Sequence, residues 1–142
     1  MTIRFRDDMF ESDAAFDAEA TELPSLFAEC GTAIFAVMAD LASVKPVETR
    51  KIRLEDDSLE MLLHRWLSEL IFIKDRDSML FREFEVRITG LEGKFTLESM
   101  NYGERIDQAR HKLGSDVKGV SFYRLSVKQE GSLWKAFVVC DL

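Results

Sequence analysis

The hydrophobic pattern over residues 23–41 is the feature that most restricts how this chain can fold. Apolar residues recur there at spacings of three and four, which places them on one side of a helix with a broad face for a core. Thr21 is positioned to cap the helix start, and Pro24 falls in the first turn, where its missing N–H costs no hydrogen bond. The apolar face comprises Leu23, Leu26, Phe27, Cys30, Ala33, Ile34, Val37, Met38 and Leu41.

A second helical pattern runs through residues 56–75. Asp57 or Ser58 can cap its start, and the acidic residues there favour the positive end of a helix. The chain therefore has two amphipathic helices that need an apolar partner surface. The buried face of the second helix is predicted to be Leu59, Leu62, Leu63, Trp66, Leu67 and Leu70.

Outside the helices the apolar period changes to two, which is typical of half-buried strands. Strands are predicted over residues 46–54, in a long hairpin over 80–102, around 123–127, and over 134–140 after a turn at Gln-Glu-Gly-Ser. These segments predict an α+β fold of about six or seven mostly antiparallel strands, with two main helices packed on one face. With only two prolines and seven glycines, and no repeat or linker, residues 1–142 are expected to form one domain.

The overall composition excludes several functional classes. The net charge is −7, from 26 acidic and 19 basic residues, so the chain is expected to repel nucleic acid phosphates and not to bind nucleic acid directly. No apolar run approaches the roughly 20 residues of a membrane helix, and the start of the chain turns acidic, so we expect a cytoplasmic protein without a membrane partner. Cys30 and Cys140 lie within apolar patterns, and we expect them to be buried free thiols.

The chain contains little that resembles nucleophilic machinery. It has no Gly-x-Ser-x-Gly elbow, phosphate-binding glycine loop or zinc spacing. His64 lies within the second helical pattern, where a surface or half-buried position is expected, and His111 lies in a polar loop, where a solvated histidine is expected. No catalytic residue is therefore assigned.

Two carboxylates near opposite ends of the chain are better candidates for a functional site, because together they could bind a metal ion. Asp13 falls at the start of an early alternating segment, and Asp141 ends the last predicted strand beside Leu142. If these two strands are neighbours, both carboxylates and a main-chain oxygen converge, and oxygen ligands of this kind suit Ca²⁺, Mg²⁺ or Mn²⁺. A solvated strand end is the alternative interpretation.

Three consecutive motifs in residues 103–123 resemble those of the archease family. They read Gly103-Glu104-Arg105-Ile106-Asp107, then His111-Lys112-Leu113, then Val117-Lys118-Gly119-Val120-Ser121-Phe122-Tyr123. Their order and spacing follow the family without a gap, and the similarity extends through both helices to the terminal Asp-aliphatic pair.

The resemblance implies an α+β fold and a role as an accessory protein rather than an enzyme. Archeases assist the GTP-dependent RtcB-type RNA ligase of tRNA splicing and RNA repair, promoting its guanylylation and multiple turnover. The resemblance also implies a divalent-metal site, with Ca²⁺ first and Mg²⁺ or Mn²⁺ as alternatives, held by Asp13, Asp141 and Leu142. Glu104 and Lys118 match family positions and are the expected contacts to the ligase.

The chain also departs from the family at positions that carry chemistry. Phe10 and Glu11 replace a histidine and a threonine of the N-terminal motif, and Tyr123 replaces a second histidine. Because of these departures, the protein could instead be a divergent binding or chaperone-like module that has lost ligase activation. Alternatively, the aromatic residues Phe10 and Tyr123 simply pack across a sheet. A metal-dependent phosphoryl or nucleotide enzyme is a third hypothesis, ranked last because no base or nucleophile accompanies the aspartates.

Overall fold

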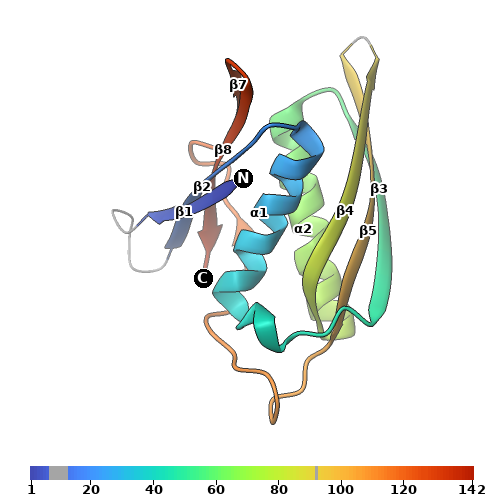
Figure 1. The fold of residues 1–142 in the computed structure, drawn as a ribbon, viewed down its shortest axis with the longest axis vertical. Coiled ribbons are helices and arrows are strands. Elements are labelled where there is room, and N and C mark those ends of the chain that lie inside the picture. Colours follow the sequence, from blue (N-terminus) through green and yellow to red (C-terminus); the bar gives the residue numbers. More distant parts are fainter. Residues whose placement is uncertain (7–12, 92) are drawn as a thin grey trace.

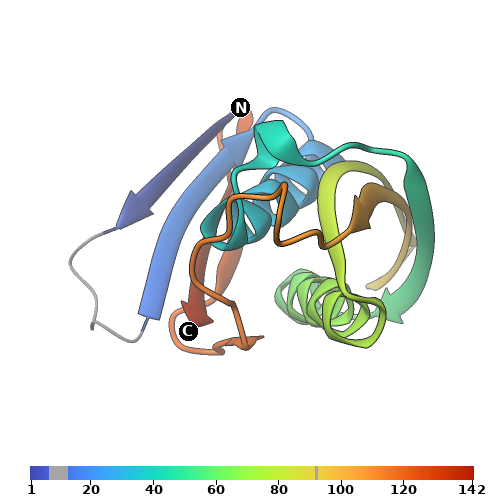
Figure 2. The same cartoon turned by 90° about the horizontal axis from the view of Figure 1, so that it is seen from below.

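The fold is taken from a computed structural model that describes residues 1–6, 13–91 and 93–142. Two helices lie between two antiparallel sheets and cover one face of each, so the molecule has three layers (Figures 1 and 2). The elements in chain order are β1 (Thr2–Arg6), β2 (Asp13–Ala20), α1 (Leu23–Met38), η1 (Leu41–Ser43), β3 (Glu48–Asp56), α2 (Leu59–Asp77), β4 (Met79–Leu91), β5 (Lys94–Arg105), β6 (Gly119–Val120), β7 (Ser126–Glu130) and β8 (Leu133–Asp141).

The two sheets differ in the number and order of their strands. The larger sheet has the order β1-β2-β8-β6, with β7 also paired to β8, and the smaller one has the order β3-β5-β4. The predicted α+β class is confirmed. The described residues contain eight strands rather than six or seven, because β1 and the two-residue β6 were not predicted. One continuous apolar core joins both helices to the inner faces of both sheets.

Helix α1 begins and ends slightly differently from its sequence pattern. Glu22 occupies the N-cap position without a side-chain hydrogen bond, so the predicted cap by Thr21 is wrong, while Pro24 does lie in the first turn. The helix ends at Met38 because Asp40 starts a separate 3₁₀ turn, in which its side chain accepts a hydrogen bond from the Ala42 N–H at 3.2 Å.

Helix α2 follows the prediction closely. The Ser58 hydroxyl oxygen accepts a hydrogen bond from the Met61 N–H at 3.2 Å, so Ser58 is the cap. Trp66 is fully buried, and its indole N–H donates to the Ser99 hydroxyl at 2.9 Å, which ties the helix to β5. None of the helices in the described residues is long and apolar enough to span a membrane.

The predicted long hairpin is β4 and β5, which pair along nearly their whole length. A bulge interrupts the register between Phe81 and Glu83, where the backbone of β4 passes very close to Gly103. A Cβ atom on Gly103 would lie 1.8 Å from the Leu80 carbonyl oxygen, so only glycine fits there.

The segment before the last hairpin was predicted incorrectly. Tyr123 does not belong to a strand, because residues 123 and 124 form a turn with Arg124 at φ 55°, and β7 begins only at Ser126. Tyr123 is 56% exposed, so it does not pack across a sheet as one interpretation held. Phe10 and Glu11 lie outside the described residues.

Candidate functional site

The pairing of β2 with β8 brings the two predicted metal-binding aspartates together. Asp13 lies directly opposite Asp141 in the antiparallel register, at the end of both strands. Residues directly opposite each other project from the same face of a sheet, with Cβ atoms about 4.5–5.5 Å apart. The condition set by the sequence, that these two strands be neighbours, is therefore met.

Both aspartates belong to the outer face of the larger sheet, away from the helices. Phe16 and Ala18 of β2 enter the main core, so Asp13 and Ala15 must project to the other side. On that outer face Ala15, Phe137 and Val139 form a separate small apolar cluster next to the aspartates. The two carboxylates thus lie at the edge of this apolar cluster and remain accessible to solvent.

In the described parts of the chain, the two carboxylates lack a direct charged partner. Within residues 1–6, 13–91 and 93–142, neither Asp13 nor Asp141 takes part in an ion pair or a side-chain hydrogen bond. Burial raises the pKa of the neighbouring Cys140 thiol to about 12, and the negative charges of Asp141 and Asp13 add to that rise in pKa. Cys30 and Cys140 are both buried and free, as predicted.

Main-chain groups complete this end of the sheet. The Lys118 N–H donates to the Asp141 carbonyl oxygen at 2.8 Å, and Gly119 lies opposite Asp141 on its other side. A Cβ on Gly119 would be 3.7 Å from the nearer Asp141 carboxylate oxygen, so the glycine leaves this carboxylate uncrowded. Leu142 is partly buried against the core. The predicted residues Asp13, Lys118, Asp141 and Leu142 are therefore neighbours.

The donor set defines what kind of cation fits. In the part of the chain that the structure describes, no group of three His, Cys, Asp or Glu side chains converges on one point. A cation here would be held by the Asp13 and Asp141 carboxylates and a main-chain oxygen of Leu142, with water at its other positions. Hard cations that accept several waters and carboxylates fit such a set better than zinc, which prefers nitrogen and sulfur ligands.

Glu104 lies elsewhere, at the end of β5 in the smaller sheet, and is only 8% exposed. One carboxylate oxygen accepts from the Lys45 N–H at 2.6 Å and from His111 Nε2 at 3.0 Å, and the other accepts from the Arg110 guanidinium. Its role in this structure is internal, because these partners occupy both oxygens. Contact with a ligase remains a prediction, and the burial of Glu104 argues against it.

His111 is buried, so the expectation of a solvated loop histidine is wrong. The Asp107 N–H donates to His111 Nδ1 at 2.8 Å, which leaves Nε2 as the nitrogen that carries the proton and donates to Glu104. The structure thereby fixes the neutral tautomer. The sequence pattern missed this role because polar loop residues are normally solvated.

The same loop, residues 106–118, is held against both helices. Its backbone bonds to the end of α1, through the Gly114 N–H to the Met38 carbonyl oxygen at 2.7 Å. The buried Lys74 ammonium of α2 contacts the Asp116 carboxylate at 2.6 Å and the Val117 carbonyl oxygen at 3.1 Å. The loop therefore runs from the hydrogen-bonded group of Glu104, Arg110 and His111 to the Asp141 end of the larger sheet.

A pair of exposed aromatic residues lies in the segment between β6 and β7. Phe122 and Tyr123 follow β6 and are 62% and 56% exposed. The Phe122 ring stacks on His64 with ring centroids 3.9 Å apart, and His64 Nε2 donates to the Val120 carbonyl oxygen at 2.8 Å. His64 is half-buried, as expected. Two adjacent aromatic residues within a polar stretch were the available sequence signal.

The fold and site together define a small α+β protein with a helical layer between two antiparallel sheets and a paired-aspartate end on one sheet. Residues 5–142 match the sequence model of the Archease protein family (MTH1598/TM1083). The chain belongs to the archease family.

Named relatives agree with this assignment. The chain is 36% identical to Protein archease of Methanopyrus kandleri, over 92% of this chain and 94% of the relative, and 34% identical to Protein archease of Methanothermobacter thermautotrophicus, over 92% and 93%. It also resembles the solution structure of Methanobacterium thermoautotrophicum protein 1598, with a TM-score of 0.86 and 33% identity over 99% and 98% of the two chains.

A more distant structure shares the fold alone. The crystal structure of an archease from Thermotoga maritima, described as a possible chaperone, has a TM-score of 0.63 and 14% identity, covering 98% of each chain.

Proposed function

We propose that this protein is an accessory factor that activates a GTP-dependent RtcB-type RNA ligase, promoting its guanylylation and multiple turnover in tRNA splicing or RNA repair. It contributes no catalytic residue of its own and acts through a divalent cation, Ca²⁺ first, held by Asp13, Asp141 and a main-chain oxygen of Leu142. The observation that carries the proposal is the direct opposition of Asp13 and Asp141 in a chain of the archease family.

The chemistry of the site supports a bound cation. Two carboxylates that face each other repel, and a divalent ion between them relieves that repulsion. The exposed Lys118 lies beside Asp141. A ligase docking on this end would contact both the cation and Lys118.

Calorimetric titration of Ca²⁺, Mg²⁺ and Mn²⁺ into the metal-stripped protein tests the site. We expect binding that Asp13→Asn and Asp141→Asn each abolish, because each variant removes one of the two side-chain carboxylates. Asp17→Asn is the matched control, since Asp17 lies on the same strand and face but is paired with Arg4 and Arg6. Unchanged binding by Asp13→Asn and Asp141→Asn would reject the assigned ligands.

The partner is tested separately by reconstituted RNA ligation with an RtcB-type ligase, GTP and Mn²⁺. A higher multiple-turnover rate in the presence of the wild-type protein, lost with Asp141→Asn, is the expected result. The same rate with and without the wild-type protein would refute ligase activation, whatever the metal titration shows.

A second function is favoured by the aromatic turn. Phe122 and Tyr123 are large, exposed and held on a fixed backbone, which suits a binding or chaperone-like module with a different partner. Affinity capture with the wild-type protein and with a Phe122→Ser/Tyr123→Ser variant distinguishes the two functions. Capture of an RtcB-type ligase by the wild type but not by the variant would favour the ligase factor.

A further inference from the structure

Strand β4 leaves a long edge without a partner. It spans 13 residues and pairs only with β5 among the strands in the described parts of the chain (Figure 1). An unpaired edge presents free N–H and C=O groups that can pair with another strand, and proteins usually shorten such edges or protect them with proline or lysine. Residues 83–90 contain neither proline nor lysine.

The inner side of this edge also leaves apolar surface partly uncovered. Phe84, Val86 and Ile88 project toward the helices but are only half-buried. Their neighbours in the central strand β5 are buried, so the difference arises from the edge position. A strand added beside β4 would cover this surface and gain apolar burial. The buried β5 neighbours are Asn101, Ser99 and Leu97.

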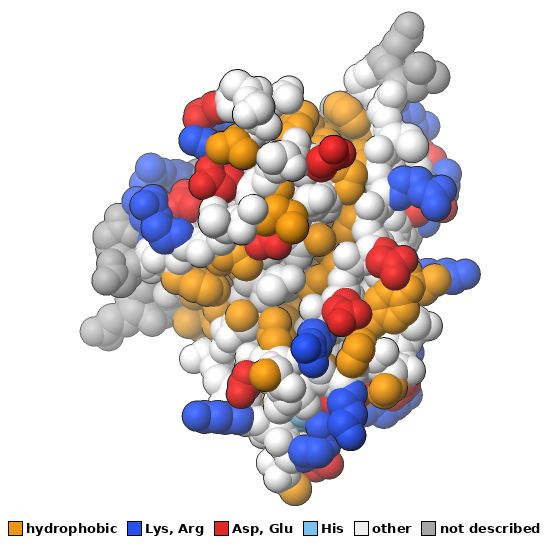
Figure 3. Space-filling model, in the orientation of Figure 1, with side chains coloured by type: hydrophobic (Ala, Val, Ile, Leu, Met, Phe, Trp, Pro, Cys, Tyr) orange, Lys and Arg blue, Asp and Glu red, His pale blue; other side chains and the backbone are white. Residues whose placement is uncertain are grey.

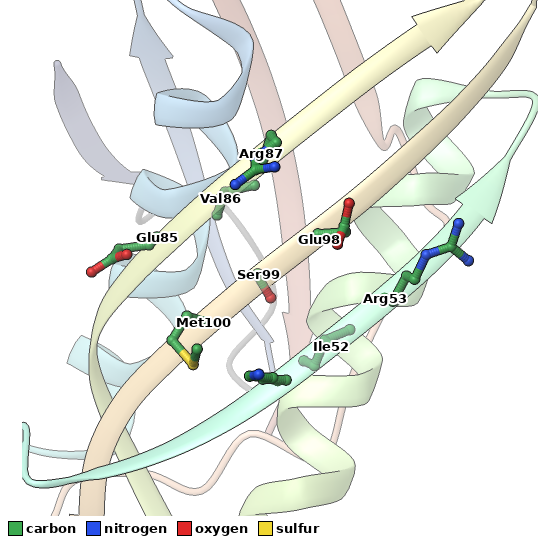
Figure 4. A pocket seen from close by; sticks show the side chains of 9 residues that line it. Ile52, Arg53, Glu85, Val86, Arg87, Glu98, Ser99 and Met100 are labelled. Carbon is green, nitrogen blue, oxygen red and sulfur yellow. The ribbon is translucent and has the colours of Figure 1, made fainter.

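The outer side of the edge carries charges of both signs. Glu85 and Arg87 lie two residues apart on β4, beside a surface hollow of about 610 Å³ on this sheet (Figure 4). The Tyr102 hydroxyl donates to the Glu85 carboxylate, and this bond and the charge of Glu85 contribute to raising the Tyr102 pKa.

We propose that β4 pairs antiparallel with β4 of a second copy of this chain, across a two-fold axis at Val86. In this register Glu85 lies opposite Arg87 of the second copy, and Phe84 lies opposite its Ile88. Two opposite-charge pairs and two apolar pairs form at once, and each contributes to strand pairing. Moving the axis to Glu85 or to Arg87 would place that residue opposite its own copy, a like-charge contact that the register at Val86 avoids.

The other edge of the same sheet shows the contrast. On β3 the corresponding outward residues are Lys51 and Arg53. An axis at Ile52 would place Lys51 opposite Arg53 of the copy, which is repulsive. At the centre of β3 the charges therefore oppose self-pairing, whereas around Val86 of β4 they favour it.

Helix α1 is suited to the same arrangement. It packs on β4 and carries one charged residue, Glu29, in its 16 positions. The side that is not fully buried includes Ala28, Thr32 and Ala36, and Figure 3 shows apolar atoms along the middle of this face of the molecule. Because the two-fold axis keeps both helical layers on one side of the joined sheet, small uncharged side chains allow the two α1 helices to approach.

Sedimentation equilibrium of the full chain tests the proposal, over about 1 to about 300 µM, a range that brackets micromolar affinities. We expect a monomer–dimer equilibrium. Arg87→Glu should raise the dissociation constant at least about tenfold, because both opposite-charge pairs become like-charge pairs. The double variant Glu85→Arg/Arg87→Glu restores opposite charges and should return the constant toward the wild-type value. Circular dichroism and thermal melts confirm that each variant is folded.

The control is Arg53→Glu on β3, which should leave dimerisation unchanged. A protein that stays monomeric over the whole range would overturn the proposal, as would an Arg87→Glu variant that dimerises like the wild type. Failure of the double variant to recover, or open-ended polymers weakened by Arg53→Glu, would also overturn it. The proposal does not depend on the metal site.

Discussion

Replacement of Glu104 by glutamine should destabilise the fold strongly although it changes one atom. Burial is the largest single influence and would raise the pKa of Glu104. Hydrogen bonds from His111, the Lys45 N–H and Arg110, with the Arg110 charge, outweigh it and lower the pKa from 4.5 to about 2. A lowering of that size corresponds to about 3 kcal/mol of stability at neutral pH.

Glu104→Gln removes the negative charge of the Glu104 carboxylate. It also places an NH₂ group where a carboxylate oxygen accepted hydrogen bonds, so that this group faces either Arg110 or the Lys45 N–H and His111, which are themselves donors. We therefore expect a loss of about 2 to 3 kcal/mol in the free energy of unfolding at pH 7, measured by urea denaturation. For a chain of this size the midpoint of thermal unfolding should fall by about 6 to 9 °C.

The pH dependence of the free energy of unfolding separates the contribution of the Glu104 charge from other effects of the substitution. Because the folded pKa lies below the unfolded one, ionised Glu104 stabilises the fold fully above the unfolded value of 4.5, and this stabilisation is lost as the pH falls toward 2. The difference between wild type and Glu104→Gln should therefore shrink over that interval. The control Glu130→Gln, at an exposed pair with Lys135, should change stability by less than about 0.5 kcal/mol. A Glu104→Gln variant as stable as this control, or a gap that does not narrow in acid, would refute the reasoning.

Three further predictions concern packing. Gly103→Ala should cost at least about 3 kcal/mol of stability by urea denaturation, because its Cβ would overlap the Leu80 carbonyl oxygen. The control Gly119→Ala should cost less than about 1 kcal/mol. Equal costs would be inconsistent with the close approach of β4 to Gly103. Cys30 and Cys140 should resist a thiol reagent in the folded protein and react after unfolding, since burial raises both pKa values; rapid native labelling would contradict it. Lys74→Met should increase amide exchange in residues 106–118 without unfolding the helices, and unchanged exchange would show that the lysine does not hold the loop.

Sequence periodicity was sufficient for the elements whose pattern is local. The spacing of three and four predicted both helices, and the alternation around a glycine turn predicted the β4–β5 hairpin, because each depends on residues that are close in sequence. The end positions were less well determined. Thr21 did not cap α1, and Tyr123 fell in a turn, because backbone conformation at element ends depends on neighbouring segments.

Tertiary structure alone decided the site and the polar interior. Asp13 and Asp141 are remote in sequence, and only the pairing of β2 with β8 places them on one face. The burial of His111 against Glu104 likewise depends on a loop folding back onto both helices. Local patterns record which side of an element is apolar, whereas the choice of neighbouring strand is set by how all the apolar faces are buried together.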